Sequence, residues 1–247
     1  MIRIFMPMSG NVGDTLNVLP VLSGIYKSTG HKISLVVKDK MKIFKGVKEL
    51  FKLQECISSL KFESEVSIDD TYNIISLVDE FTQHPIRPWE TVRLEEYFRK
   101  HYNINFEVDD AFILNVPEVE EIKGKFLVGD RMQHLDMDQR RKFNVLEASG
   151  KFPLDKFSFI DYNNSMEYNA ALVKASTLPI ITTFTGISVI ADLLNKEQIV
   201  LWGDDIKNWD NKPIEYSFNK HFYRDRGSKL MYLGDFNISH YEEQNEI

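Results

Sequence analysis

The sequence predicts an α/β protein of two domains, because β-rich runs alternate with longer helical runs in two successive series. The chain has 247 residues, which is enough for two small domains. Between the two series lies the segment 115–124, which contains Pro117 and an acidic run and is the best candidate for a linker. Strands that alternate with helices form parallel sheets, so we expect one parallel sheet in each half.

The first series opens with an apolar run at 2–6 that is typical of a buried strand. The next segment, 16–27, has helical periodicity but contains Pro20, which predicts either a kink or a helix that begins near Pro20. The other elements expected in this half are strands at 32–37, 57–60, 72–78 and 111–114 and helices at 41–53 and 89–102.

The second series predicts strands at 125–128, 157–160, 178–182 and 198–202 and helices at 137–148, 166–175 and 186–194. The remaining residues are polar and end in an acidic run. We therefore expect an N-terminal domain at 1–116, a C-terminal domain at 117–225 and an acidic tail at 226–247. Ligands of open α/β sheets bind at the carboxyl ends of the strands, so the two sheets are expected to face a cleft there.

Composition excludes several classes of protein. Hydrophobic residues make up 43% of the chain, which supports a core, yet no apolar run reaches the roughly 18 residues of a membrane span. The N-terminus lacks the features of a signal peptide. The only cysteine, Cys56, rules out an intramolecular disulfide and a cysteine-rich metal site. We expect a cytoplasmic protein.

The formal net charge of −7 argues against a general nucleic-acid binder, although a local basic patch is compatible with it. Such a patch lies in the segment 38–52. Its lysines fit either the solvated face of a helix or a surface that binds phosphate or an acceptor. They are Lys38, Lys40, Lys42, Lys45, Lys48 and Lys52, and the opposite face carries Met41, Phe44, Val47, Leu50 and Phe51.

The loop after the first strand contains the first candidate site residues, Ser9, Gly10, Asn11, Gly13 and Asp14. Its two glycines allow a tight turn and a close approach of the backbone to a ligand. No Gly-Lys-Ser/Thr follows, so it is not a Walker A loop, and it does not match the dinucleotide-binding GxGxxG pattern. Asp14 fits two interpretations, a helix N-cap or a general base at the mouth of the cleft.

The second candidate loop, 182–188, joins a buried strand to a helix and supplies the hydroxyls of Thr183, Thr185 and Ser188 beside Gly186. Backbone N–H groups at a helix N-terminus, together with hydroxyl groups, form an anion site that accommodates a diphosphate without a lysine. The alternative is that a Thr or Ser in this loop simply caps the helix.

Three segments together resemble one enzyme family. The sequence Gly-Asp-Thr-Leu-Asn-Val-Leu-Pro-Val-Leu at 13–22 resembles the GD-x-x-x-x-LP-x-L signature of the heptosyltransferase-like glycosyltransferases, the family 9-like group. Residues 182–194, followed by 198–203, resemble the family's C-terminal signature of a turn, a helix and a strand that ends in Gly. Residues 72–78 resemble its strand that starts from a Tyr-Asp pair, here Tyr72-Asn73.

The resemblance implies a GT-B fold, in which two Rossmann-like domains enclose the active site. It implies metal-independent transfer from a nucleoside-diphosphate sugar to a hydroxyl acceptor, a saccharide rather than DNA, with no further cofactor. Asp14 matches the acid that deprotonates the acceptor. Thr185, Gly186 and Ser188 match the turn that holds the donor diphosphate, and Arg131 is the nearest match to the family's basic residue.

The chain departs from this pattern at two positions, with Phe184 in place of the usual Asp and Val189 in place of the usual His. A phenyl ring cannot accept hydrogen bonds from a sugar, so one interpretation of Phe184 is a donor sugar with fewer hydroxyls at this turn than a heptose has. The alternative is that Phe184 points into the core and the turn is shifted.

The departures leave two alternative functions open, a nucleotide- or sugar-nucleotide-binding protein without turnover and a phage-type glycosyltransferase acting on modified DNA bases. A third motif, Asp136-Met137-Asp138, is compatible with a metal site or with acids at the start of a helix. The resemblance favours a protein without a metal.

Overall fold

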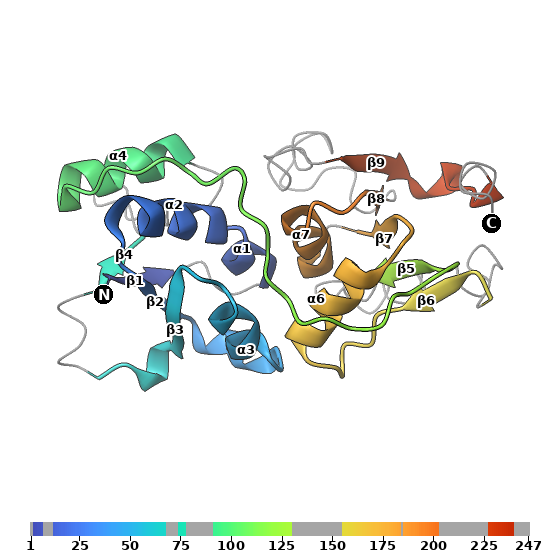
Figure 1. Ribbon diagram of the computed structural model, residues 1–247, viewed down its shortest axis with the longest axis horizontal. Helices are drawn as coiled ribbons and strands as arrows, with labels where there is room; N and C mark the ends of the chain where they lie inside the picture. The colour runs from blue at the N-terminus through green and yellow to red at the C-terminus, as the bar shows by residue number, and fades with distance from the viewer. Residues whose placement is uncertain are drawn as a thin grey trace. The chain divides into compact units, whose positions relative to one another are not determined.

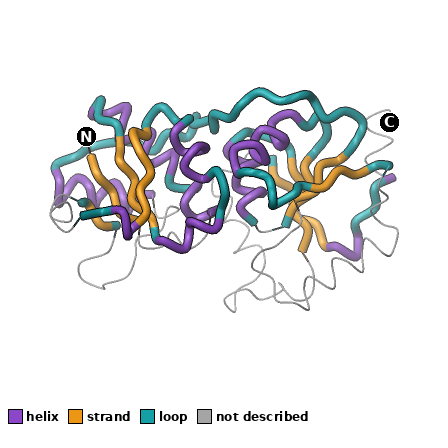
Figure 2. The backbone as a smooth tube through the Cα atoms, turned by 90° about the horizontal axis from the view of Figure 1, so that it is seen from below, coloured by secondary structure: helices purple, strands orange, loops and turns teal. Residues whose placement is uncertain are grey.

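The computed structural model describes residues 2–6, 12–67, 74–77, 91–129, 155–183, 185–202 and 227–239. It divides the chain into two compact units (Figure 1). The first comprises Met1–Pro117 with Asn163–Tyr168, and the second comprises Glu118–Tyr162 with Asn169–Ile247. Each unit contains one parallel sheet with helices packed against it, so the α/β prediction is confirmed (Figure 2).

The sheet of the first unit has the order β3-β2-β1-β4, and every neighbouring pair is parallel. Its central strands are apolar and rich in β-branched residues, which pack well on a pleated surface. All residues of β2 are buried. The strands are β1 (Ile2–Met6), β2 (Ile33–Val37), β3 (Ile57–Phe62) and β4 (Ile75–Ser76).

The first unit's helices follow its strands along the chain. Pro20 lies in the first turn of α2, where its missing N–H leaves no hydrogen bond unmade, so the helix begins near Pro20 as one of the two alternatives predicted. The α2 helix ends at Gly30, which has a φ of 69° and donates its N–H to the Tyr26 carbonyl. The helical segments are α1 (Val12–Leu16), α2 (Leu19–Thr29), η1 (Asp39–Ile43), α3 (Val47–Lys52), η2 (Glu63–Glu65) and α4 (Thr91–Tyr102).

The single helix predicted at 41–53 is wrong, because the chain forms the 3-10 helix η1 and the separate α-helix α3 there. Gly46 lies between them with a φ of 76°, a left-handed conformation that interrupts an α-helix. The apolar face was nevertheless assigned correctly, since Met41, Phe44, Val47, Leu50 and Phe51 are all buried.

The strand predicted at 111–114 is also wrong, because residue 111 belongs to a turn and residues 112–114 have no regular secondary structure. Phe112 and Leu114 are buried, which explains the apolar alternation in the sequence. The backbone just beyond is bound by a side chain instead of a strand. Gln54 Oε1 accepts the Asn115 N–H at 2.9 Å, and Gln54 Nε2 donates to the Asn115 carbonyl at 2.9 Å.

The second unit has a parallel sheet of the order β6-β5-β7-β8-β9. A cluster around Phe126, Val128 and Phe157 forms part of its core, together with Ile181, Ile199, Leu201 and Phe236. Two helices follow β6 and β7. The elements are β5 (Phe126–Gly129), β6 (Phe157–Phe159), α6 (Met166–Ala175), β7 (Ile180–Thr182), α7 (Gly186–Leu193), β8 (Gln198–Trp202), β9 (Ser228–Tyr232) and η6 (Leu233–Asp235).

The tail predicted from residue 226 onwards is wrong for residues 228–232, which form β9 and pair in parallel with β8. The strand is short, lies at the edge of the sheet and carries the exposed Lys229, so its sequence lacks the apolar run of a central strand. The helix predicted at 137–148 lies outside the described residues.

Cys56 lies immediately before β3 and is 2% exposed. Burial raises the pKa of its thiol to about 12, and the charges of Asp109 and Glu55 act in the same direction. Among the described residues, no helix is long and apolar enough to cross a membrane.

Candidate functional site

The end of strand β5 marks the switch point of the second unit's sheet. The strand has β6 on one side and β7 on the other, and Gly129 at its end pairs with Thr182 at the end of β7. Ligands of open α/β sheets bind in the crevice outside the strand ends at such a point. The turn that follows Thr182 is the second candidate loop predicted from the sequence.

This turn brings Thr183, Thr185, Gly186 and Ser188 together at the N-terminus of α7. Thr183 is 4% exposed and Thr185 is 8% exposed. In the part of the chain that the structure describes, the Oγ1 atom of neither residue has a hydrogen-bond partner. Buried hydroxyls are normally paired, so two unpaired hydroxyls at one helix N-terminus indicate a place for a ligand.

The hydroxyl of Ser188 differs from these two because it is used within the turn. Ser188 Oγ accepts the Thr185 N–H at 3.1 Å and donates to the Thr185 carbonyl at 2.6 Å. The N–H of Thr185 also donates to the Thr183 carbonyl at 2.7 Å. Thr185 occupies the N-cap position of α7, so the alternative that a Thr caps this helix is confirmed by its position. Ser188 shapes the turn, and direct contact between its side chain and a donor remains a prediction.

The first turn of α7 contains no acidic residue, and the helix is buried from Ile187 to Leu193. It packs closely on the end of β5, since a Cβ atom added to Gly129 would lie 2.5 Å from Ile187 Cγ2. Val189, which stands in place of the family's His, is fully buried. The N-terminal partial charge of α7 is therefore not neutralised by an acid of its own first turn.

In the first unit, Gly13 and Asp14 lie in the five-residue helix α1, which begins at Val12. Asp14 is therefore the third residue of the helix and does not occupy the N-cap position, so the N-cap alternative is wrong. Its side chain is half-buried. A carboxylate in the first turn complements the positive end of the helix dipole.

Several predicted residues lie outside the described part of the chain: Ser9, Gly10, Asn11, Arg131, Asp136, Asp138 and Phe184. Their roles remain predictions. Within the described ranges, no group of three or more His, Cys, Asp or Glu side chains is arranged to hold a metal ion.

The lysine cluster is largely paired with nearby acids in the first unit. Lys38 contacts Glu63 at 3.0 Å, and Lys48 contacts Glu65 at 2.7 Å. Lys42 contacts Asp39 at 3.1 Å. These acids neutralise the lysine charges that a phosphate would need. The face that carries Met41, Phe44, Val47, Leu50 and Phe51 is buried, so the structure favours the solvated-face interpretation for these three lysines.

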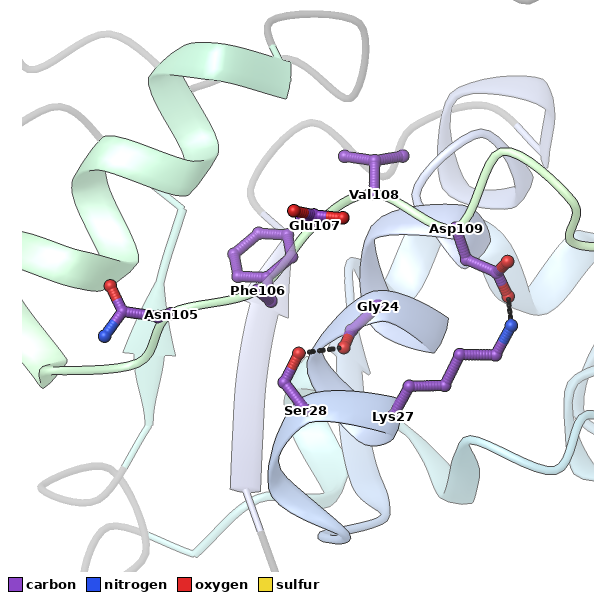
Figure 3. A pocket seen from close by; sticks show the side chains of 8 residues that line it. All are labelled: Gly24, Lys27, Ser28, Asn105, Phe106, Glu107, Val108 and Asp109. Atoms are coloured by element: carbon purple, nitrogen blue, oxygen red, sulfur yellow. Dashed lines mark hydrogen bonds and ion pairs between the residues drawn. The ribbon is translucent and has the colours of Figure 1, made fainter.

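A cavity of about 620 Å³ lies between α2 and the segment 105–109 of the first unit (Figure 3). Lys27 Nζ and Asp109 Oδ2 point toward each other across it and are 2.7 Å apart. Ser23 Oγ donates to the same carboxylate at 2.6 Å. Burial raises the pKa of Asp109, but these two hydrogen bonds outweigh it and leave the pKa below its usual value.

The segment also passes directly over α2 at Gly24, because a Cβ atom there would fall 2.0 Å from the Glu107 carbonyl oxygen. The Asp109 N–H donates to the Pro20 carbonyl at 3.1 Å. The carboxylate and the backbone N–H of Asp109 thus bind the segment 105–109 to α2. The cavity lies at the contact between these two elements and is not one of the predicted sites.

The fold of the chain is similar to that of solved glycosyltransferase structures. The Escherichia coli heptosyltransferase WaaC with ADP aligns over 99% of this chain and 99% of its own, with a TM-score of 0.57 and 13% sequence identity. WaaC with ADP-2-deoxy-2-fluoro heptose aligns with a TM-score of 0.55. A family 9 glycosyl transferase from Veillonella parvula aligns over 99% of this chain and 88% of its own, with a TM-score of 0.53 and 13% identity.

At this low identity the similarity shows the fold, which is the two-domain, Rossmann-like α/β fold of the heptosyltransferase-like glycosyltransferases. No protein-family model and no curated protein sequence matches the chain.

Two residues of the site were missed by sequence analysis, Gly129 as a packing position and Gln198 at the start of β8. A glycine at the end of a predicted strand was visible in the sequence, but only the register of β5 against β7 places it beside the turn. No sequence signal distinguished Gln198 from an exposed residue at the start of a strand.

Proposed function

We propose that the protein is a glycosyltransferase that transfers a sugar from a nucleoside-diphosphate sugar to an acceptor hydroxyl. The observation that carries this proposal is the N-terminus of α7, where the Oγ1 atoms of Thr183 and Thr185 are buried and unpaired beside a helix end with no acid in its first turn. Hydroxyl groups and backbone N–H groups of this kind are suited to the oxygens of a diphosphate.

The chemistry follows from where charge develops. As the acceptor oxygen attacks C1 of the sugar, the bond from C1 to the diphosphate oxygen breaks, and negative charge grows on the leaving diphosphate. Donors already fixed at the N-terminus of α7 stabilise that charge without reorganising. Gly186 allows the backbone of the first turn to approach the diphosphate closely, and Arg131 is proposed as an additional phosphate contact.

Asp14 is proposed to accept the proton of the acceptor hydroxyl. Removing this proton increases the nucleophilicity of the acceptor oxygen during the attack. The loop residues Ser9, Gly10, Asn11 and Gly13 are proposed to surround the acceptor, which we infer to be a saccharide. The reaction needs no metal, because the leaving diphosphate is stabilised by hydrogen-bond donors.

The test is a thermal-shift screen of the full chain against a panel of nucleoside-diphosphate sugars, followed by detection of the released nucleoside diphosphate. A ligand at 100 times its dissociation constant stabilises the protein by about 2.7 kcal/mol, an effect that is readily measured. Stabilisation followed by release on addition of a saccharide acceptor supports the proposal. Stabilisation without any release or hydrolysis supports a binding protein instead, and tight binding to DNA with a steep salt dependence supports the DNA-modifying alternative.

A further inference from the structure

The side chain of Gln198 is fully buried at the start of β8 and makes hydrogen bonds in three directions. Its Nε2 atom donates to the Ser188 carbonyl of α7 at 3.0 Å and to Ser228 Oγ of β9 at 2.9 Å. Its Oε1 atom accepts the Thr182 hydroxyl of β7 at 3.1 Å. Both amide hydrogens are therefore used, and the oxygen has a partner.

These bonds continue into the turn at the N-terminus of α7. Gln198 holds the backbone of Ser188, and the hydroxyl of Ser188 holds both the N–H and the carbonyl of Thr185. On the other side, Gln198 holds Thr182, the last residue before the turn. The exit from β7 and the first turn of α7 are thus connected to β8 and β9 through one side chain.

We infer that Gln198 is a positioning residue, which fixes Thr185 and the first turn of α7 in the geometry that receives the donor diphosphate. It does so without touching the ligand. The inference rests on the proposed function for its ligand, but the positioning itself is a property of the protein alone. A fully satisfied buried network rigidifies the groups that it joins, and donors that are already ordered lose less entropy when a ligand binds.

The position requires an amide rather than a polar side chain in general. One amide N–H of Gln198 donates to the Ser188 carbonyl, and the other donates to Ser228 Oγ. A glutamate of the same shape would place a carboxylate oxygen against the Ser188 carbonyl oxygen, and no hydrogen bond could form between them. A leucine would remove the hydrogen bonds to the Ser188 carbonyl and to Ser228 Oγ, and it would take away the acceptor of the Thr182 hydroxyl. Each change breaks the link between the sheet and the turn.

The experiment compares Thr182→Val, Thr182→Ser, Gln198→Glu and the control Ser176→Ala. Thr182→Val keeps the shape of the residue and removes the hydroxyl that Gln198 Oε1 accepts, whereas Thr182→Ser retains it. Ser176 is a matched control because it is 2% exposed in the same unit and donates to the Leu178 carbonyl at 3.0 Å, outside this network. If Gln198→Glu does not fold, Thr182→Val still tests the network, because it removes one of its hydrogen bonds without changing Gln198.

The first readout is hydrogen exchange of the Thr185 and Val189 amides without ligand, since both are hydrogen-bonded in the turn. We expect exchange about tenfold faster in Thr182→Val, a restored rate in Thr182→Ser and no change in Ser176→Ala. The second readout is affinity for ADP, UDP, GDP and CDP, and we expect about tenfold weaker binding of whichever binds the wild type.

Unchanged exchange in Thr182→Val and in Gln198→Glu, with only a lower melting temperature, would overturn the inference, because it would show purely structural bonds. Faster amide exchange with unchanged affinity for the nucleoside diphosphate would overturn the part of the inference that concerns the donor site. If the wild type binds none of the four nucleoside diphosphates, the proposed function fails, and the exchange rates alone decide whether Gln198 holds the turn.

Discussion

The junctions that follow β1 and β7 are built from the same local element, a parallel strand that leads into a helix, yet they differ in charge. The α1 helix has five residues and carries Asp14 in its first turn. The α7 helix has eight residues and carries no acid in its first turn, where two buried hydroxyls are unpaired. A carboxylate repels a diphosphate, whereas the positive end of a helix dipole attracts it.

The difference matches the complementary tasks that we propose for the two units. In the first unit, an acid lies in the first turn of the helix, and we propose that it accepts a proton. In the second unit, the first turn has no acid, and we propose that this helix end binds the diphosphate of the donor. The proposed division between acceptor and donor chemistry therefore follows from a single feature, the presence or absence of an acid in the first helical turn.

The largest effect should come from removing the acid in the first unit. Asp14→Asn is expected to lower turnover about 100-fold or more, the usual scale for loss of a general base. The donor affinity should not change, because the residue acts on the acceptor. Measuring kcat and donor affinity separately checks both statements.

Glu49→Gln is the matched control, since Glu49 lies in the first turn of α3 in the same unit and is exposed. It should leave turnover unchanged. An Asp14→Asn variant that transfers sugar at the wild-type rate would show that Asp14 is only a helix-stabilising residue.

Thr183→Val and Thr185→Val should each weaken binding of the nucleoside diphosphate about tenfold, because a hydrogen bond to a charged group is lost. Their stability should be unchanged or higher, since each variant removes a buried hydroxyl that has no partner. Isothermal titration and thermal unfolding measure the two quantities.

The control Ser176→Ala should behave in the opposite way. It removes a hydroxyl that is bonded to the Leu178 carbonyl, so stability should fall by about 1 kcal/mol while affinity stays the same. Lower stability with unchanged affinity in the two Thr variants would contradict a ligand role for these hydroxyls.

Gly129→Ala should disturb the same turn through packing. Its new Cβ would lie 2.5 Å from Ile187 Cγ2, so we expect a loss of stability of about 1–3 kcal/mol and weaker donor binding. Adding Ile187→Ala removes the clash. The combined variant should therefore be less destabilised than the sum of the two single variants by more than about 0.5 kcal/mol. Strict additivity in denaturant unfolding would show that the two residues do not press on each other.

The smallest expected effect is that of a chelator. If amides and hydroxyls hold the diphosphate, treatment with EDTA should leave the transfer rate unchanged. The assay is a comparison of initial rates before and after metal removal. Loss of activity that manganese restores would indicate a metal site at Asp136 and Asp138. It would also contradict the proposal that the N-terminus of α7 holds the diphosphate without a metal.

The alternation of strands and helices was predictable because buried parallel strands and their helices have strong apolar patterns. The predicted helix at 166–175 and the strand at 198–202 match the structure at both ends. Errors occurred where a local feature overrides the pattern. The extended Phe44 ends η1 and the left-handed Gly46 precedes α3, and Gln54 supplies to residue 115 the hydrogen bonds that a neighbouring strand would supply.

The candidate site was predictable in its residue types but not in its internal bonding. The sequence identified Thr183, Thr185 and Ser188 as equivalent hydroxyls, and only the structure separates the unpaired pair from the one used in the turn. Gln198 could not be predicted, because its partners lie on three other elements that the register of the sheet brings together.

The buried thiol of Cys56 can report unfolding of the protein without any added label site. The chain has a single cysteine, it belongs to the first unit, and its pKa of about 12 leaves almost no thiolate at neutral pH. A thiol-specific reagent should therefore label the protein only when that unit opens. Because the proposed donor site lies in the other unit, slower labelling in the presence of a nucleoside diphosphate would mean that both units open as one cooperative body. An unchanged rate would mean that each opens independently.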